Sequence, residues 1–273
     1  MRITVAINTY NHAAYLDQAL EGVLMQQTTY PYEVLVVDDC STDGTPDVLE
    51  HYARRHPGLI RAIVNERNQG ALSSMIQLFE QARGDYVATF DGDDYWTDPA
   101  KLQLQVSFLE ANPDFVLCGH NCVMRNEWTG TETLRPDGGR DLILTTSDLI
   151  DFHLPAGSMV FRNGLLPPWP ECFRSLAFGD RVLALMLSEV GKVHYWTRPM
   201  SVYRIHAQGL WSSAYLIDPY QPIPETTPAG LAKLVEFWEA LVEYLDHRYD
   251  DRIDALIGYW KIAMERGNAE SSR

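Results

Sequence analysis

The sequence has no long apolar run. Its 273 residues are 46% hydrophobic, yet no segment approaches the roughly 18 consecutive apolar residues of a membrane-spanning helix. The apolar stretch at residues 3–7 leads at once into Asn8 and Thr9, and it is too short for the core of a signal peptide. We therefore expect a cytoplasmic protein with no transmembrane segment.

Basic residues are scarce. Lys and Arg number 22 against 37 Asp and Glu, which gives a formal net charge of −15. Such a charge repels nucleic acid phosphates and anionic lipid surfaces, so we expect no nucleic acid partner. A small phosphorylated ligand is a different case, because one bound cation can reverse the local field.

Cysteine is also sparse, and its spacing excludes two familiar structural devices. The four thiols, Cys40, Cys118, Cys122 and Cys172, show no paired framework spacing, so we expect free and mostly buried cysteines. The Cys118-Gly-His120-Asn-Cys122 segment invites a zinc interpretation, but no second pair of ligands follows it. We expect buried thiols here.

The first 110 residues alternate strand and helix patterns in the manner of βαβ units, which favours a parallel sheet. Thr45-Pro46 predicts a helix start, with Thr45 as N-cap and proline at the first helical position. The predicted strands are 3–7, 34–37, 59–64 and 86–90, and the predicted helices are 16–24, 45–55, 70–82 and, later in the chain, 182–190.

Polar clusters follow three of these strands, at residues 8–11, 38–39 and 91–94. Ligands of open parallel sheets bind beyond the carboxyl ends of the strands, so the clusters are expected to converge at one edge. Asp91-Gly92-Asp93-Asp94 places three carboxylates in four residues. A divalent metal with oxygen ligands would relieve their repulsion and leave positions free for a phosphate-bearing substrate.

These motifs, taken in order, resemble those of the family-2 glycosyltransferases of the GT-A fold. The motifs are the opening run 5–11, the turn 36–45, Asn68-Gln69-Gly70, and 84–86 leading to 91–94. The resemblance implies an α/β fold with a mostly parallel central sheet flanked by helices. It also implies a catalytic domain over 1–213, with a nucleotide-sugar half (about 1–115) and an acceptor half (about 116–213). The rest of the chain does not match these motifs, and its residue pattern predicts a loop and a C-terminal helical extension over 214–273.

The resemblance assigns donor-binding roles to residues at the strand ends. Asn8, Thr9 and Tyr10 would border the nucleotide base, and Asp39 would accept the hydrogen of its imide. Asn68 is placed among the donor-binding residues through the Asn68-Gln69-Gly70 motif.

In the acidic motif, Asp93 would bind Mn²⁺ or Mg²⁺ on the donor diphosphate. Asp91 would lie near the ribose or in the outer coordination sphere of the metal, and Asp94 would support them. A Lewis acid at this place would stabilise the negative charge that develops on the leaving nucleoside diphosphate.

In the second half, Asp180 is our candidate for the base that takes the acceptor's proton. The family usually has Glu-Asp here, and Gly179 replaces that glutamate. The later Tyr-Arg-Ile-His motif makes Arg204 a candidate phosphate contact and His206 a candidate metal or diphosphate contact.

Two further segments are assigned only in outline. Gly157 and Ser158 lie in a small-residue segment expected to line the acceptor side. Residues 213–227 are expected to form a loop over the site, with closure on donor binding as a hypothesis. Apolar residues at helical spacing between 228 and 265 predict an amphipathic helix or helical pair, which packs on the catalytic domain, forms a homodimer or contacts a membrane surface.

The sequence therefore predicts a metal-dependent, inverting glycosyltransferase, with a UDP-sugar as first expectation for the donor and a dTDP-sugar as second. The acceptor hydroxyl would belong to a carbohydrate, a lipid-linked or a small-molecule acceptor. A sugar-nucleotide-forming nucleotidyltransferase is an alternative, although the glycine-rich triphosphate loop with its basic residue is absent after the first strand. A non-catalytic nucleotide-sugar binding module is another, and a dinucleotide-dependent oxidoreductase is disfavoured because no G-x-G-x-x-G follows that strand.

Overall fold

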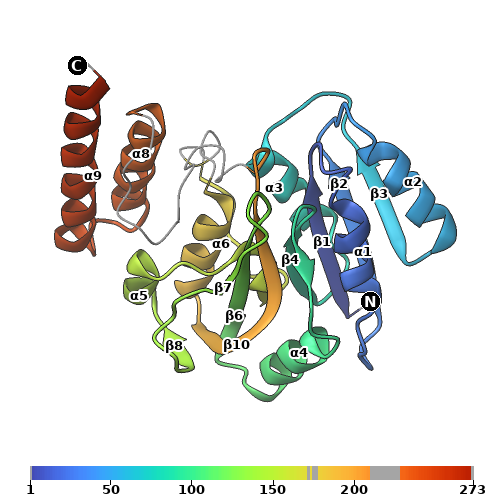
Figure 1. The fold of residues 1–273 in the computed structure, drawn as a ribbon. Coiled ribbons are helices and arrows are strands. Elements are labelled where there is room, and N and C mark those ends of the chain that lie inside the picture. Colours follow the sequence, from blue (N-terminus) through green and yellow to red (C-terminus); the bar gives the residue numbers. More distant parts are fainter. Residues whose placement is uncertain (1, 171–172, 174–177, 210–227, 272–273) are drawn as a thin grey trace. The chain divides into compact units, whose positions relative to one another are not determined.

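The computed structural model describes residues 2–170, 173, 178–209 and 228–271 (Figure 1). The chain divides into two units. The first comprises Met1–Pro168 and Gly179–Arg204, and the second comprises Trp169–Phe178 and Ile205–Arg273. The predicted division at residue 213 stays a prediction.

The first unit is built on one mixed sheet of ten strands within the described residues, with the order β3-β2-β1-β4-β9-β6-β10-β5. Two further strands lie off this path, since β7 pairs with β6 and β8 pairs with β10. The strands are β1 (Ile3–Thr9), β2 (Tyr32–Asp38), β3 (Ile60–Val64), β4 (Tyr86–Asp91), β5 (Tyr95–Trp96), β6 (Phe115–Asn126), β7 (Glu132–Leu134), β8 (Leu142–Leu144), β9 (Val160–Arg162) and β10 (Lys192–Ile205).

The helices of this unit alternate with the strands, as the sequence pattern predicts for the first 110 residues. Strands β1 to β4 pair parallel with one another, β1 with β2 and β4 and β2 with β3, and they match the four predicted strands. The helices are α1 (Leu16–Leu24), α2 (Thr45–Arg55), α3 (Ala71–Gln81), α4 (Lys101–Ala111), α5 (Thr146–Asp151), α6 (Gly179–Ser188) and the 3₁₀ helix η1 (Ala156–Ser158).

The second half of the sheet differs in direction from the first. Strand β9 pairs antiparallel with both β4 and β6, and β10 pairs antiparallel with β5 and β8. None of the strands of this half is among the four predicted from the sequence. They are short or pair across long stretches of chain, so their pattern alone gives little sign of them.

The core lies around the parallel strands. Leu16, Ala19, Leu20 and Val23 of α1 are fully buried, which confirms the apolar stripe read from the sequence. Gly22 lets α1 approach the sheet closely, because a Cβ there would lie 2.9 Å from the backbone nitrogen and oxygen of Trp96. The close packing of α1 on the sheet therefore holds in place the strands whose carboxyl ends carry the polar clusters.

The start of α2 differs from the prediction. Gly44 is the N-cap and Thr45 is the first helical residue. The Thr45 hydroxyl instead accepts a hydrogen bond from the His12 amide (2.9 Å), while Asp43 Oδ1 accepts one from the Thr45 amide (2.9 Å). Thr45 is thus used to join the loop after β1 to the loop after β2.

The second unit contains α8 (Pro228–Tyr244) and α9 (Asp250–Ser271), which pack on each other and confirm the predicted helical pair. Val235, Trp238 and Leu241 of α8 are buried, as is Leu245 directly after it, in agreement with the spacing. The buried ring of Phe237 also contacts Phe173 and Phe178. The expected loop at 213–227 and Cys172 lie outside the described residues.

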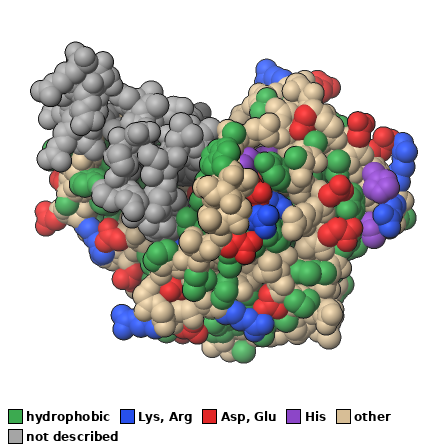
Figure 2. All heavy atoms as spheres, in the orientation of Figure 1, with side chains coloured by type: hydrophobic (Ala, Val, Ile, Leu, Met, Phe, Trp, Pro, Cys, Tyr) green, Lys and Arg blue, Asp and Glu red, His purple; other side chains and the backbone are tan. Residues whose placement is uncertain are grey.

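The described residues also bear on the expectations about membrane spans, cysteines and charge. None of its helices is both long enough and apolar enough to cross a membrane. Cys118 and Cys122 are buried and free, while Cys40 is half-buried and free. On the face drawn in Figure 2, acidic and basic side chains of the described residues are interspersed.

Candidate active site

The polar clusters after β1, β2 and β4 meet at one edge of the sheet, as predicted. In the strand register Asn8 lies opposite Asp91, and Thr9 lies opposite Asp38. Beyond the strands, the Asp39 amide donates to the Thr9 carbonyl (2.9 Å) and the Gly92 amide donates to the Asn8 carbonyl (2.9 Å). The parallel pairing therefore continues into the loops that carry the candidate site residues.

The turn through Gly92 packs tightly against the loop after β1. A Cβ at position 92 would lie 2.7 Å from Thr9 Oγ1 and 3.2 Å from His12 Nδ1, so a side chain is excluded there. The other ring nitrogen of His12, Nε2, lies 3.6 Å from Asp93 Oδ2. The glycine of the Asp-Gly-Asp motif thus brings a histidine beside the candidate metal ligand.

The three carboxylates of this motif form an acidic cluster in which burial opposes ionisation. Burial and the charges of Asp93 and Asp180 raise the pKa of Asp91 well above its ordinary value. Burial and the charges of Asp93 and Asp91 do the same to the pKa of Asp94. A cation beside these groups would favour their ionised forms.

Arg204, near the end of β10, holds the acidic turn. Its backbone amide donates to Asp94 Oδ1 (2.9 Å), and its guanidinium donates to the Asp93 carbonyl, to Gln18 and to Glu127 Oε1 (3.1 Å). The side chain is 5% exposed. Each guanidinium nitrogen has a protein acceptor, so the structure assigns Arg204 contacts within the protein, and its expected phosphate contact stays a prediction.

Asp39 is buried and joins β2 to the loop before α3. Its Oδ1 accepts hydrogen bonds from Asn65 Nδ2 (3.0 Å) and the Gln69 amide (2.9 Å), and its Oδ2 accepts one from the Gly70 amide (2.8 Å). These contacts fix the carboxylate at the strand-end edge. Its expected contact with a nucleotide imide stays a prediction.

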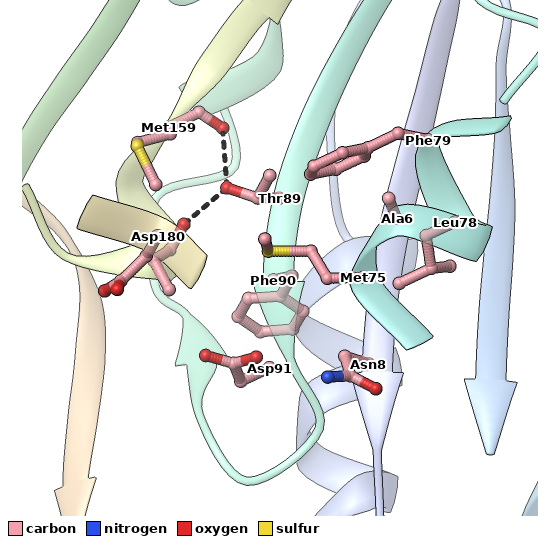
Figure 3. A pocket seen from close by; sticks show the side chains of 11 residues that line it. Ala6, Asn8, Met75, Leu78, Phe79, Thr89, Phe90, Asp91, Met159 and Asp180 are labelled. Carbon is pink, nitrogen blue, oxygen red and sulfur yellow. Dashed lines mark hydrogen bonds between the residues drawn. The ribbon is translucent and has the colours of Figure 1, made fainter. Parts of the chain in front are cut away.

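Asp180 and Asp91 line the same small cavity, although they are 89 positions apart in the sequence (180 minus 91). The cavity has a volume of about 20 Å³, enough for about one water molecule. Figure 3 shows Asp180 on α6 and Asp91 at the end of β4 on one side of it, with Asn8 of β1 across from them. The candidate base and the acidic motif therefore meet within one unit.

Asp180 is held as an anion by its partners. Burial opposes its ionisation, but His153 and the Arg181 amide outweigh that effect, so the pKa of Asp180 is lowered. His153 Nε2 lies 2.7 Å from Asp180 Oδ2, and the Arg181 amide donates to Asp180 Oδ1 (2.8 Å).

The glycine in place of the usual glutamate has a local explanation. A Cβ at Gly179 would lie 2.5 Å from Met75 Cε and 3.2 Å from Leu72 Cδ1, both on α3. Met75 lines the cavity beside Asp180. In this chain the methionine occupies the space beside position 179, so a side chain there would displace it.

The small-residue segment lies under the acidic turn and is buried. The Gly157 carbonyl accepts a hydrogen bond from Trp96 Nε1 (2.8 Å), and a Cβ at this position would lie 3.3 Å from the Phe90 ring. Ser158 Oγ donates to the Pro155 carbonyl (2.7 Å). These contacts make the segment part of the support of β4, and its acceptor-side role stays a prediction.

The remaining predicted residues differ in exposure. Tyr10 is exposed, Asn68 is exposed and accepts a hydrogen bond from the Gly70 amide (3.0 Å), and Asn8 Nδ2 donates to the Ala71 carbonyl (3.1 Å). His206 is buried and belongs to the second unit, where its carbonyl accepts a hydrogen bond from the Gly209 amide (3.1 Å).

Several residues at the site are absent from the sequence predictions. Asn65 directly follows β3, so the strand-end rule that selects Asp39 would also have selected it. Burial and the charges of Asp94, Asp93, Asp91 and Asp180 raise the pKa of Tyr203, which places its phenol beside the acidic cluster. His12 and His153 carry no sequence signal of their own.

The side chains at the site can be compared with the ligands that a divalent metal ion needs. Within the described residues, no group of three or more His, Cys, Asp or Glu side chains is arranged to hold a metal ion. Mg²⁺ and similar ions are commonly bound by one or two carboxylates, with substrate phosphates and water completing the shell. Asp93, in its acidic cluster, fits a site of that kind.

The comparisons with known proteins agree with the resemblance of the sequence motifs. The sequence matches the family described as "Glycosyl transferase family 2" over residues 4–166, which is more than half of the chain. This chain belongs to glycosyl transferase family 2. Residues 4–166 of the family 2 enzyme include β1 except its first residue, β2 to β4, the acidic motif and the small-residue segment.

A relative from Mycobacterium tuberculosis, "Uncharacterized protein Rv1520", is 32% identical over 255 residues and covers 93% of this chain and 72% of its own length. Staphylococcus aureus TarS 1-349, solved with UDP-GlcNAc, has a TM-score of 0.66 at 18% identity, over 93% of this chain and 70% of its own. The mannosyltransferase PcManGT from Pyrobaculum calidifontis, solved with GDP-Man and Mn²⁺, has a TM-score of 0.63 at 19% identity, over 98% and 75%.

These likenesses confirm the GT-A fold and the glycosyltransferase class. The family 2 assignment also removes the nucleotidyltransferase alternative. The two structural neighbours have bound nucleotide sugars in their own structures.

Proposed function

We propose that this family 2 enzyme is a metal-dependent, inverting transferase that moves a sugar from a nucleoside diphosphate donor to an acceptor hydroxyl. The observation that carries the proposal is the shared cavity of Asp180 and Asp91 at the carboxyl end of β4. A candidate base and the acidic motif of a donor site therefore lie beside each other.

Asp93 is the residue we assign to the metal, as Mn²⁺ or Mg²⁺. It is 17% exposed in a cluster of like charges, and such a cluster favours a bound cation. When bound, the ion supplies Lewis-acid stabilisation of the charge on the leaving diphosphate. The Mn²⁺ in the PcManGT structure supports this choice by analogy. The contact of His206 with the ion or the diphosphate stays a prediction from the sequence.

Asp180 is the residue we assign to acceptor activation. In direct displacement, the acceptor O–H bond breaks, its proton passes to the carboxylate, and the acceptor oxygen forms the new glycosidic bond as the nucleoside diphosphate leaves. An ionised carboxylate close to the reacting centre can serve this step. The His153 contact, which lowers the pKa of Asp180, supports its resting state as a base.

For the donor we propose a UDP-sugar first and a dTDP-sugar second, with Asn8, Thr9, Tyr10, Asp39 and Asn68 around the nucleotide. The acceptor would be a carbohydrate, a lipid-linked or a small-molecule hydroxyl, in surface polysaccharide, glycolipid or natural-product glycan assembly. We expect the enzyme in the cytoplasm, with peripheral attachment to the inner face of the membrane as the alternative.

The test is a screen of UDP-, dTDP- and GDP-sugars, each with Mn²⁺ and with EDTA, read as thermal shift and as release of nucleoside diphosphate. We expect one nucleotide class to stabilise the wild type in the presence of metal. Asp93→Ala should lose that stabilisation and lower turnover about 100-fold or more. Asp180→Asn should lose turnover but keep the donor-induced shift.

The matched control is Asp114→Ala, since Asp114 is 77% exposed and pairs with Lys192 at the start of β10, away from the carboxyl ends of β1, β2 and β4. It should behave as the wild type. If no donor stabilises the wild type, with Mn²⁺ or with EDTA, the proposed donor site is wrong, and the nucleotide-sugar binding module fails with it.

A further inference from the structure

His153 forms a close pair with the candidate base. Its Nε2 lies 2.7 Å from Asp180 Oδ2, although 27 positions separate the two residues. The loop between α5 and η1 carries His153, and the first turn of α6 carries Asp180. The ring is 39% exposed, whereas the Asp180 side chain is 13% exposed, so the histidine is the more exposed partner of the pair.

The surroundings of Asp180 on its other side are unfavourable to a negative charge. Asp91 lines the same cavity and interacts repulsively with Asp180. The other cavity residues near it, such as Met75 and Met159, are apolar. A carboxylate in such a place tends to take up a proton and turn away unless a donor fixes it.

The backbone that carries His153 is itself anchored. The Arg135 guanidinium donates to the His153 carbonyl (2.5 Å) and lies over the Phe152 ring, 5.2 Å from its centroid. Leu154, the next residue, is buried. The imidazole therefore approaches Asp180 from a fixed loop and not from a freely moving one.

We propose that His153 is the positioning residue for the base of this enzyme: its imidazole orients the Asp180 carboxylate beside Asp91. The inference rests on the proposed function, because it gives Asp180 the role of base. It adds a residue that acts through Asp180 and touches neither the sugar nor the metal.

The test measures UDP release from the best UDP-sugar of the donor screen, with Mn²⁺ and with water as acceptor. We expect His153→Ala to lower kcat about 10- to 100-fold while the donor-induced thermal shift stays as in the wild type. His153→Gln, whose side chain carries a hydrogen-bond donor, should keep more activity. Added imidazole should restore part of the activity of His153→Ala, which a purely structural role does not predict.

A double-mutant cycle decides whether His153 acts through Asp180. On the Asp180→Asn background, His153→Ala should cause no further loss, because residues that act as a unit are not additive. The control is His247→Ala, since His247 makes a similar pair with Asp250 (2.9 Å) in the second unit. It should leave turnover unchanged.

Three outcomes are informative. Wild-type kcat in His153→Ala, or an equal loss on both backgrounds, would overturn the positioning role. If Asp180→Asn itself turns over as the wild type does, the proposed base is wrong. If Asp180→Asn is inactive while His153→Ala is fully active, only the inference on His153 fails.

Discussion

At the scale of single residues, Arg204 illustrates how one side chain fixes the acidic turn. Its guanidinium donates hydrogen bonds to Glu127, Gln18 and the Asp93 carbonyl. The ring centroids of Tyr95 and Tyr15 lie 4.5 and 5.1 Å from the guanidinium carbon. Buried cations with several partners are costly to remove, because the partners remain buried without a donor.

We predict that Arg204→Ala lowers the free energy of unfolding by about 3 kcal/mol, measured by urea denaturation. Arg198→Ala is the control, because Arg198 pairs with Asp98 but is 59% exposed. Its loss should stay within about 1 kcal/mol. Equal losses in the two variants would contradict the anchoring role of Arg204.

Lys101 is a second residue whose setting has a measurable consequence. Its side chain is fully buried, and its Nζ lies 4.0 Å from the centroid of the Trp96 ring. Burial lowers the pKa of Lys101 to about 7. Burial also raises the pKa of the neighbouring Cys118 thiol to about 12, so the thiol stays neutral and supplies no counter-charge.

Between pH 7 and about 10, the unfolded chain binds more protons at Lys101 than the folded protein does, so stability from this site rises with pH. We predict that the unfolding free energy of the wild type minus that of Lys101→Met rises across this range, by on the order of 4 kcal/mol at most. Urea titrations of both proteins from pH 6 to 10 measure the difference. A difference that is independent of pH would contradict the lowered pKa.

At the scale of secondary-structure elements, the contact between α6 and α3 shapes the cavity beside the candidate base. Gly179 begins α6, and the side chains of Leu72 and Met75 on α3 fill the space where its Cβ would lie. Because the end of Met75 is flexible, a side chain at 179 is accommodated only if the methionine moves.

We predict that Gly179→Ala lowers the unfolding free energy by about 1 to 3 kcal/mol, through overpacking. In combination with Met75→Ala the loss should be smaller than the sum of the two single losses, since the methionine no longer competes for the space. A double-mutant cycle by urea denaturation gives the coupling. Strict additivity would mean that the two side chains do not compete.

At the scale of the whole molecule, the acidic composition bears on partners. With a net charge of −15, the protein is repelled by anionic surfaces at long range. Tyr259 and Ile262 of α9, in the second unit, are exposed. Sedimentation velocity would test the predicted homodimer through the C-terminal helices.

We predict that the full protein does not co-sediment with vesicles that contain phosphatidylglycerol at about 0.15 M salt. Each accessible Lys or Arg near such a surface contributes only about 1 kcal/mol, against a net repulsive charge. Salt-sensitive binding would instead indicate a basic surface and favour peripheral attachment.

What the sequence by itself determined is local or periodic. The alternation of apolar runs predicts the four parallel strands and their helices, and the polar residues after each run predict the edge at which Asp39 and Asp91 meet. These inferences succeed because side-chain period and turn chemistry depend on neighbouring residues.

Only the tertiary structure decided which distant residues complete the site. It brings His153 to Asp180, His12 to Asp93, and Arg204 to Glu127, and it fills the space beside Gly179 with Met75. It also decides the antiparallel half of the sheet. Pairings between residues far apart in the chain depend on how whole elements pack, and no local pattern encodes that packing.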